Sequence, residues 1–403
     1  MTQAAAVPAD RLGAWCGWVT VGTAALAPLL IWIGPLAFAP VLGLMGLLCL
    51  PAARIEDRDR PLAVVLALML VWAAVSTTWS PHKPDDLEGS TALKLALQLP
   101  LYWAAWCGAR RAEPGLRRRA LAVFAWVMAG VGLLMLVEAL TGAAAYQAMR
   151  NLIGDPIRAD LARKNLAQGS FALALLWPVA AAAASRAGAP GWLAVPMVLG
   201  AVTLAWRFLS DAPVMAVALS AAVTLAAWLW PRGAPKTMAV MATLYVLLMP
   251  LATLPILSLS EAAPASWAQR IGYWDHTIGW MSDHPFRGWG LDASRAFSPG
   301  IQLHPHNGAL QVWLELGMAG AVLAAIAWVT ILRRLARDER DWAAAAALGS
   351  AAAYLFFGAV SFGVWQEWWL ALGALAAAIA GMAEAEPPRR TAARPSTRTA
   401  TSG

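Results

Sequence analysis

Mostly apolar runs, each about 20 residues long, recur from one end of this chain to the other, and a membrane-spanning helix needs a run of that length. Hydrophobic residues make up 60% of the chain and charged residues only 13%. Soluble domains carry about a quarter charged residues. A soluble protein this apolar could not cover its surface with polar groups. The sequence therefore predicts an all-α integral membrane protein.

The apolar runs predict about twelve transmembrane helices. They lie at residues 13–33, 34–52, 61–79, 92–109, 119–140, 168–185, 190–209, 213–230, 236–257, 309–332, 342–360 and 362–384. Residues 1–384 then form one polytopic transmembrane domain. The first run lacks a clear cleavage site and continues into further spans, which favours a retained helix. The basic tail 385–403 is rich in Pro, Arg, Thr and Ser, and we expect it to be disordered.

Charge distribution predicts that both termini are cytoplasmic. With the N-terminus inside, most of the 30 Lys and Arg residues fall in inner loops and in the tail, as the positive-inside rule requires. This spread indicates topology and not nucleic-acid binding. All five histidines then fall outside. The two long outer connections, 141–167 and 258–308, are the places where function is expected.

The outer loop 258–308 contains one helical apolar stripe, formed by Trp267, Ile271, Trp274, Ile278 and Met281. Such a helix beside a bilayer is expected to lie in the interface plane. Arg270, Tyr273 and Thr277 are expected on a different face. The helix is then either an anchor only, or a support that holds Arg270 over a lipid headgroup.

The same loop ends in His304-Pro305-His306-Asn307, directly before the span that starts near Ala309. Histidine can exchange protons near neutral pH. Glu315 and Gln311 follow on one face of that span, and an ionisable Glu in a span is a candidate functional residue or structural pair. His304 and His306 lack a matching carboxylate or cysteine cluster, so neither a metal site nor a cofactor is predicted.

Other outer cations are candidates for binding an anion, because the planar fork of Arg suits phosphate. Arg207 ends the seventh span and either snorkels to the interface or faces a cavity. In the loop 141–167, Arg163 and Lys164 precede Asn165 at the entry to the sixth span. These residues either meet a phosphate or form an ordinary solvated run.

These residues resemble the O-antigen ligase family, within the ligase and polymerase superfamily of bacterial glycan assembly. The family pattern is His, then Asn, Ser or Gln, nine residues, Gly, two residues, then Gly, Thr or Tyr. This chain has His306-Asn307, nine residues, Gly317, two residues and Gly320. The segment from Arg270 to Trp274 and the stretch 283–290 are similar to the large outer loop of the family.

One further position matches the family, and one position differs from it. Asn165 followed by Leu-Ala is similar to the loop-to-helix entry before the sixth span. Where the family has a Ser-Arg pair, this chain reads Arg207-Phe208-Leu209-Ser210-Asp211. The departure leaves the second phosphate-binding cation open between Arg207 and a residue of 158–164.

The resemblance implies a glycosyltransferase of the bacterial inner membrane with its active site facing the periplasm. Such enzymes move a glycan from undecaprenyl pyrophosphate to a hydroxyl of lipid A–core, without metal or nucleotide. His306 would act as the base, and Arg270 with a second cation would stabilise the pyrophosphate leaving group. A single displacement at the anomeric carbon would invert its configuration.

Three other functions remain open. A glycan polymerase of the same superfamily would use a second undecaprenyl-linked unit as its acceptor, and a ligase could instead glycosylate protein. A twelve-span secondary transporter would also have both termini inside. However, transporters often show two similar halves, and this sequence shows no such repeat.

Overall fold

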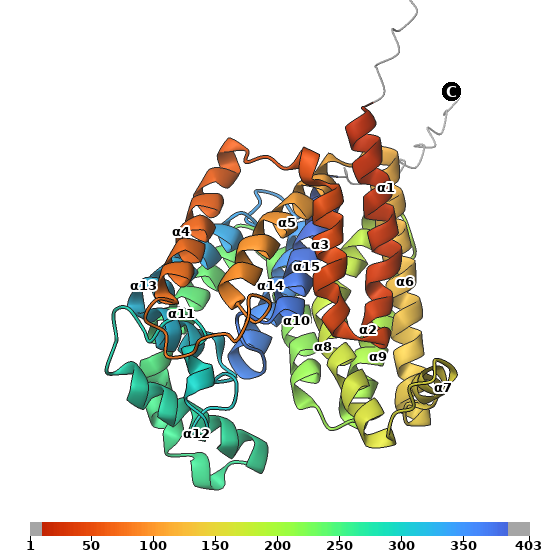
Figure 1. Cartoon of the computed structure of the whole chain (residues 1–403). Helices are drawn as coiled ribbons and strands as arrows, with labels where there is room; N and C mark the ends of the chain where they lie inside the picture. Colours follow the sequence, from red (N-terminus) through yellow and green to blue (C-terminus); the bar gives the residue numbers. More distant parts are fainter. Residues whose placement is uncertain (1–9, 386–403) are drawn as a thin grey trace, which may run out of the picture.

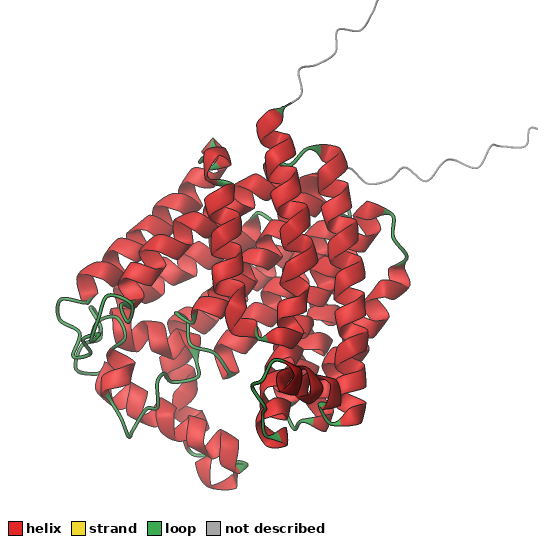
Figure 2. Cartoon of the chain, turned by 45° about the vertical axis from the view of Figure 1, so that its right-hand side comes forward, coloured by secondary structure: helices red, strands yellow, loops and turns green. Residues whose placement is uncertain are grey.

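The computed structural model describes residues 10–385, and within this range every regular element is helical, which confirms the all-α prediction (Figure 2). The first half comprises α1 (Arg11–Leu26), η1 (Ala27–Leu29), α2 (Leu30–Ile33), η2 (Pro35–Ala37), α3 (Phe38–Leu48), η3 (Leu50–Ala52), η4 (Asp57–Asp59), α4 (Arg60–Ser76), α5 (Thr91–Arg111), α6 (Pro114–Thr141), α7 (Ala144–Leu152) and α8 (Ala159–Ala187). The second half comprises η5 (Gly191–Leu193), α9 (Ala194–Arg207), α10 (Asp211–Leu229), α11 (Gly233–Leu257), η6 (Ser260–Ala262), α12 (Ala265–Met281), η7 (Ala293–Ala296), α13 (Gly308–Arg333), α14 (Trp342–Val360) and α15 (Glu367–Ala385).

Nine helical segments within residues 10–385 are long and apolar enough to cross a membrane. Each of the other three predicted spans also contains a helix. Two of these, Pro35–Leu48 and Gly191–Arg207, are shorter apolar segments. The third, α5, is 21 residues long but carries Lys94, Gln98 and two arginines in its last turn. The molecule is an integral membrane protein, and the count of twelve stays a prediction.

Capping residues explain where several helices begin and end. Ser90 and Asp341 precede α5 and α14, and their side chains accept hydrogen bonds from the first free backbone N–H groups. Gly142 and Gly188 end α6 and α8 in the left-handed conformation that glycine adopts without strain. Local capping residues, together with hydropathy, therefore determine where these helices begin and end.

Small residues let the helices approach closely. Gly132 of α6 and Gly200 of α9 meet at one crossing, where a Cβ on Gly200 would lie 2.2 Å from the carbonyl oxygen of Gly132. Close contacts of this kind are typical of membrane helices, because lipid provides no hydrophobic drive for association. The core is accordingly rich in buried alanine.

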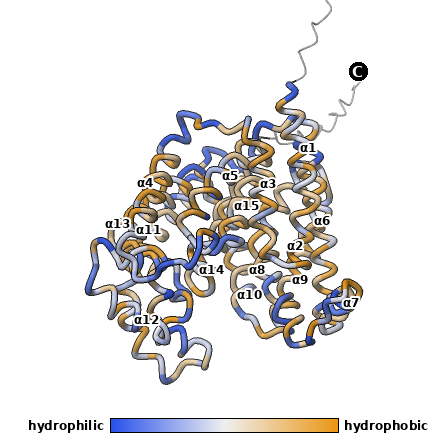
Figure 3. Tube along the Cα trace, viewed as in Figure 1, coloured by the Kyte–Doolittle hydropathy of each residue, from blue (hydrophilic) through white to orange (hydrophobic). Residues whose placement is uncertain are grey.

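The two ends of the bundle differ (Figure 1). The start of α1 and the end of α15 lie at one end, where Arg117 donates a hydrogen bond to the carbonyl of Ala385. The helices α7 and α12 lie at the opposite end. Hydrophilic segments gather mainly at the two ends of the bundle (Figure 3). Ala385, the first residue of the predicted tail, ends α15. The rest of that tail, 386–403, lies outside the described residues.

The two long connections contain more helix than the sequence suggested. The connection 141–167 holds α7 and the first turns of α8, which begins at Ala159. The sequence had suggested that Asn165 lies at the entry to this helix. The structure instead places Asn165 inside α8. The connection 258–308 holds η6, α12 and η7. Its amphipathic helix, expected from the Trp stripe, is confirmed as α12 (Ala265–Met281).

Candidate active site at the start of α13

The helix α13 is broken at Gly317, whose φ of 65° and ψ of −165° are not helical. Three carbonyls freed by the break, of Leu314, Glu315 and Leu316, accept hydrogen bonds from the backbone N–H of Trp289, the backbone N–H of Gly290 and the indole of Trp72. Beyond the break, the N–H groups of Met318 and Ala319 donate to the carbonyls of Pro285 and Phe286. The loop 285–290 thus satisfies the backbone groups of the broken helix.

The glycines of the sequence motif have a physical reason at this break. A Cβ on Gly317 would lie 2.5 Å from the backbone nitrogen of Gly288, and a Cβ on Gly288 would lie 2.5 Å from the nitrogen of Gly317. Both residues also have a positive φ, which glycine adopts at little cost. At Gly320, a Cβ would lie 2.2 Å from the Cβ of Leu316. Gly317 and Gly288 therefore keep the helix and the loop in contact, and Gly320 leaves room for Leu316 within the helix.

Glu315, a predicted substrate-binding residue, is fully buried beside the break. Its carboxylate accepts hydrogen bonds from the backbone N–H of Asp292 (3.0 Å), Ser294 Oγ (2.7 Å), Gln311 Nε2 (3.1 Å) and Trp365 Nε1 (2.6 Å). These donors come from the outer loop, from α13 itself and from the α14–α15 connection. The geometry assigns Glu315 to holding the loop and the two helices together.

His306 lies directly before α13, half-buried, with a positive φ of 55°. Its Nδ1 lies 2.8 Å from the carbonyl oxygen of Ser361. Because a carbonyl only accepts hydrogen bonds, Nδ1 carries the proton of the neutral ring and Nε2 keeps a lone pair. Burial lowers the pKa of His306, the Ser361 hydrogen bond raises it, and the charge of Arg270 lowers it. The net shift is downward, so the ring is a neutral base at neutral pH.

His304 positions its neighbour. Its Nδ1 accepts a hydrogen bond from the backbone N–H of His306 (3.1 Å), and its Nε2 lies 3.2 Å from Nε2 of the Gln366 side chain. Burial, with the charges of His306 and Arg295, lowers the pKa of His304 to about 3. His304 therefore stays neutral and fixes the unusual backbone conformation of His306.

Asn307 forms the N-cap of α13 and leaves one donor free. Its Oδ1 accepts from the backbone N–H of Leu310 (3.1 Å) and from the hydroxyl of Tyr245 (3.2 Å). Within residues 10–385, its buried Nδ2 has no hydrogen-bond partner. A buried donor without a partner is costly. The site therefore offers a hydrogen-bond donor beside His306.

The helix α12 brings a cation to this histidine. Arg270 donates through Nη1 to the carbonyl of Ser266 and lies 5.6 Å from the ring centroid of Trp267. Within the described part of the chain its Nε is buried without a partner and no carboxylate pairs with it. One turn further along, the ring of Tyr273 stacks on that of His306, with centroids 6.0 Å apart.

The face that α12 buries is wider than the predicted stripe. Tyr273 and Thr277 are buried together with Ile271 and Trp274, whereas Trp267 is 38% exposed. Ile271, Tyr273 and Trp274 pack with Leu310 of α13 and with apolar residues of α11. The helix therefore docks on protein along both predicted faces, and it carries Arg270 near enough to His306 for its charge to lower the pKa of that ring.

The remaining predicted residues form a second group, at the C-terminal end of α6. Arg207 is exposed and donates through Nε to the carbonyl of Ala139 (3.4 Å). The guanidinium of Arg163 lies 3.6 Å from where a Cβ of Gly142 would stand. The C-terminal end of a helix attracts cations. Lys164 and Asn165 are exposed on α8. No hydrogen bond or ion pair in the described chain joins this group to the His306 group.

Sequence reasoning missed the contribution of residues 361–366. The span predicted at 362–384 begins too early, because α14 ends at Val360 and α15 begins at Glu367. The intervening segment supplies the Ser361 carbonyl, the Trp365 indole and the Gln366 amide described above. Tyr245 was also missed, since it lies inside the apolar run 236–257. The one sequence signal that could have identified these residues was the presence of polar side chains within apolar runs.

The histidines are not part of a larger cluster of metal ligands. Among the described residues, no group of three or more His, Cys, Asp or Glu side chains is arranged to hold a metal ion. The site instead combines a neutral imidazole, an unpaired guanidinium and an amide donor, next to a broken membrane helix. These features define an integral membrane protein with acid–base and anion-binding groups at one end of its bundle.

Comparison with known proteins agrees with this class. Residues 171–325, somewhat more than a third of the chain, match the family model described as O-antigen ligase. This range includes Arg207, Arg270, His306 and both motif glycines, but not residues 163–165.

Part of the chain is also similar to curated proteins. Proteins named "Putative polysaccharide ligase" from Rickettsia conorii and Rickettsia felis are 28% and 27% identical to this chain over 126 residues. That alignment covers 28% of this chain and 31% of each relative, so the chain spans about a third of the length of these relatives. A relative from Rickettsia bellii is 35% identical over 71 residues, which is 18% of this chain and 17% of that protein. No solved structure matches.

Proposed function

We propose that this protein is a glycosyltransferase of the O-antigen ligase type. It moves a glycan from undecaprenyl pyrophosphate to a hydroxyl of lipid A–core, at the periplasmic face of the bacterial inner membrane. One observation carries the proposal: the ring of His306, held through Nδ1 by the Ser361 carbonyl, is within reach of the charge of Arg270, whose Nε has no partner among the described residues. A base and a cation are what transfer from a pyrophosphate donor requires.

In the proposed reaction, His306 Nε2 takes the proton of the acceptor hydroxyl as that oxygen attacks the anomeric carbon. The new bond is oxygen to carbon, and the bond from the anomeric carbon to the pyrophosphate oxygen breaks. The electron pair leaves with undecaprenyl pyrophosphate, and the anomeric configuration inverts. The lowered pKa keeps His306 unprotonated before attack, and the departing anion then offsets the positive charge that the ring acquires.

Arg270 is proposed to bind the pyrophosphate. Its guanidinium lacks a carboxylate partner in the described chain, so an anionic ligand would complete its hydrogen bonding. The Nδ2 of Asn307, which has no partner among the described residues, is proposed to donate to the same donor substrate or to the acceptor. Because two cations at the leaving group neutralise its growing charge, we propose a metal-independent reaction.

The second cation is proposed to come from the group at the end of α6. Arg207 and Arg163 lie there, and the exposed Lys164 and Asn165 follow Arg163 directly in α8. Arg158 is a weaker candidate, because its Nε and Nη2 already donate to the carboxylate of Asp160 at 3.0 and 2.9 Å. The lipid tail of the donor would enter laterally between helices, which requires the reacting groups to lie at the level of the membrane surface.

The decisive experiment compares surface glycans of a deletion strain that carries either the parent gene or His306→Ala. For a ligase, loss of function removes all long glycan from lipid A–core while undecaprenyl-linked polymer accumulates. Retention of a single repeat unit on the core would instead indicate the polymerase. Normal glycan in the His306→Ala strain, with the variant present in the membrane, would contradict the proposed base.

A further inference from the structure

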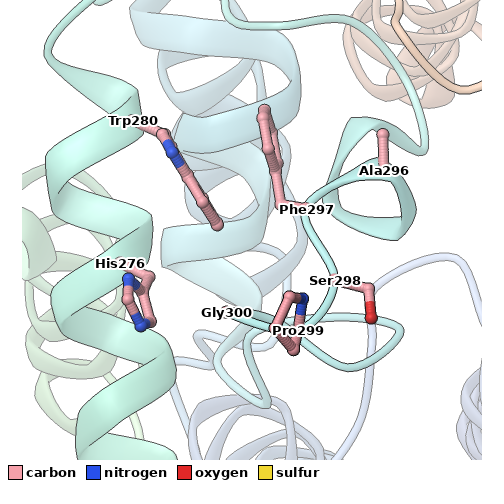
Figure 4. Close-up of a pocket in the computed structure, with 7 residues that line it drawn as sticks. All are labelled: His276, Trp280, Ala296, Phe297, Ser298, Pro299 and Gly300. Atoms are coloured by element: carbon pink, nitrogen blue, oxygen red, sulfur yellow. The ribbon is translucent and has the colours of Figure 1, made fainter.

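A second site lies on the same helix as Arg270. The residues His276, Trp280 and Phe297, with the loop segment 298–300, line an open pocket of about 430 Å³ (Figure 4). This volume lies within the range of small-molecule sites, about 300–1,000 Å³. The pocket belongs to the outer connection and not to a membrane-spanning segment. None of its lining residues serves in the proposed transfer step.

The pocket walls are aromatic rings in mutual contact. Trp280 stacks on Phe297 with centroids 4.1 Å apart, and His276 stacks on Trp280 at 5.5 Å. Behind them the indole of Trp289 donates to the carbonyl of Trp280 at 2.7 Å and fixes the base of the wall. Gly300 permits this packing, because a Cβ there would lie 2.7 Å from the Trp280 ring.

The chemistry of the lining favours a neutral polyhydroxyl ligand. The pocket contains no Lys, Arg, Asp or Glu, so nothing in it would hold a phosphate. The C–H groups on the apolar face of a sugar ring carry partial positive charge and are attracted to the negative face of an aromatic ring. The imidazole of His276 and the hydroxyl of Ser298 provide polar atoms at the rim for sugar hydroxyls (Figure 4).

The position of the pocket relative to Arg270 also favours a sugar ligand. His276 and Trp280 follow Arg270 by six and ten residues, which places them about 9 and 15 Å further along the helix axis. Tyr273, which stacks on His306, shares a helix face with Trp280 because seven residues make two turns. A glycan whose reducing end lies at Arg270 and His306 could follow α12 from Tyr273 to Trp280.

We propose that this aromatic pocket binds a sugar unit of the transferred glycan or of the acceptor core, a few units from the reacting bond. The proposal rests on the glycosyltransferase function, and it adds a specificity site that lies away from the chemistry. A sugar held there would orient the glycan without contacting the base.

Saturation-transfer NMR on the full-length protein in detergent tests the pocket without any turnover. The two probes are lipid-free oligosaccharides from the same bacterium: fragments of its surface polysaccharide and its core oligosaccharide. The parent protein should saturate sugar ring protons of one probe, which identifies the source of the bound unit. Trp280→Ala should weaken binding about three- to tenfold, as the loss of one aromatic stack predicts.

Control variants make the result specific. Trp280→Phe should retain binding, and Phe286→Ala should not change it, because Phe286 is a 68% exposed ring on the same loop outside the pocket. His276→Ala removes an exposed ring and keeps the test valid if Trp280→Ala does not fold. His306→Ala should bind sugar like the parent, which separates this proposal from the catalytic one. Equal saturation in the parent, Trp280→Ala and His276→Ala would overturn it.

Discussion

Gly288 and Gly317 face each other across the break in α13, so close that a Cβ on either would lie 2.5 Å from the backbone nitrogen of the other. The contact joins the outer loop to a membrane helix through backbone alone. It also places His306, at the start of that helix, in a fixed relation to the loop that precedes it. The candidate active site thus depends on two residues without side chains.

We predict that Gly317→Ala destabilises the protein. The φ and ψ of Gly317 lie in a region that is almost exclusive to glycine, so the substitution should cost about 1–3 kcal/mol from strain alone, and the contact with Gly288 adds to it. Thermal unfolding in detergent measures the loss. Gly130→Ala is the matched control, because no atom lies within 4 Å of its added Cβ; equal stability of the two variants would contradict the role of the break.

We expect the rate of glycan transfer to fall at acidic pH with the protonation of His306. A base works when unprotonated, so activity is present above its pKa and lost as the pH falls through it, by about tenfold per pH unit. Because the pKa of His306 is lowered, this decline should begin below the ordinary histidine value of about 6.5.

A second variant tests the cause of that shift. Arg270→Gln removes one charge that lowers the pKa of His306, so its acidic limb should move to higher pH while its maximal rate falls. Burial is the larger cause and remains, so the move should be partial. An acidic limb that stays in place would show that the two side chains do not interact.

Arg270→Lys should lose about 10- to 100-fold in transfer rate, because an ammonium keeps the charge but not the two parallel hydrogen bonds of the guanidinium. Initial rates in membrane vesicles that contain the lipid-linked donor give the measurement. Arg158→Lys is the control, since Arg158 is exposed and already paired with Asp160. A parent-like rate in Arg270→Lys would argue against phosphate recognition by a fork.

Glu315→Gln should destabilise the protein by about 1–3 kcal/mol, because an amide nitrogen would face donors that now point at a carboxylate. Four donors meet Glu315. Chemical unfolding checks the value, with the exposed Glu261→Gln as the control. If transfer is lost while stability is unchanged, Glu315 contacts substrate and is not only a structural link.

Glycan transfer should continue at its full rate after dialysis against EDTA, because arginines are proposed to neutralise the leaving group. The assay is the same vesicle reaction with and without chelator. Loss of activity that is restored by a divalent cation would show that the leaving group needs a metal.

The sequence predicted the helical fold well, because apolar length and capping are local properties. It placed His304, His306 and Asn307 correctly before α13, since a polar cluster ahead of a long apolar run can be read directly. It could not show the break at Gly317, because the apolar pattern continues through it. The backbone partners that make the break possible lie about thirty residues earlier in the chain, at 285–290.

Long-range contacts also explain what was missed around His306. Ser361 and Gln366 reach the histidines through the connection between α14 and α15. Hydropathy had assigned residues 362–366 of this connection to the last span. Conversely, Arg207 and Arg163 were grouped with the site because of their charge. The structure places both at the end of α6, a position that could not be read from their charge.

The outer connection 258–308 contains one segment whose length is fixed by its contacts and another whose sequence is free to vary. Residues 285–290 pair with the broken helix through their backbone, so insertions or deletions there would dismantle the base and its support. The tip at 296–300 makes its backbone hydrogen bonds within the loop. Related proteins could therefore vary this tip to accommodate different sugars while inheriting the same reacting groups, so that selectivity evolves independently of catalysis.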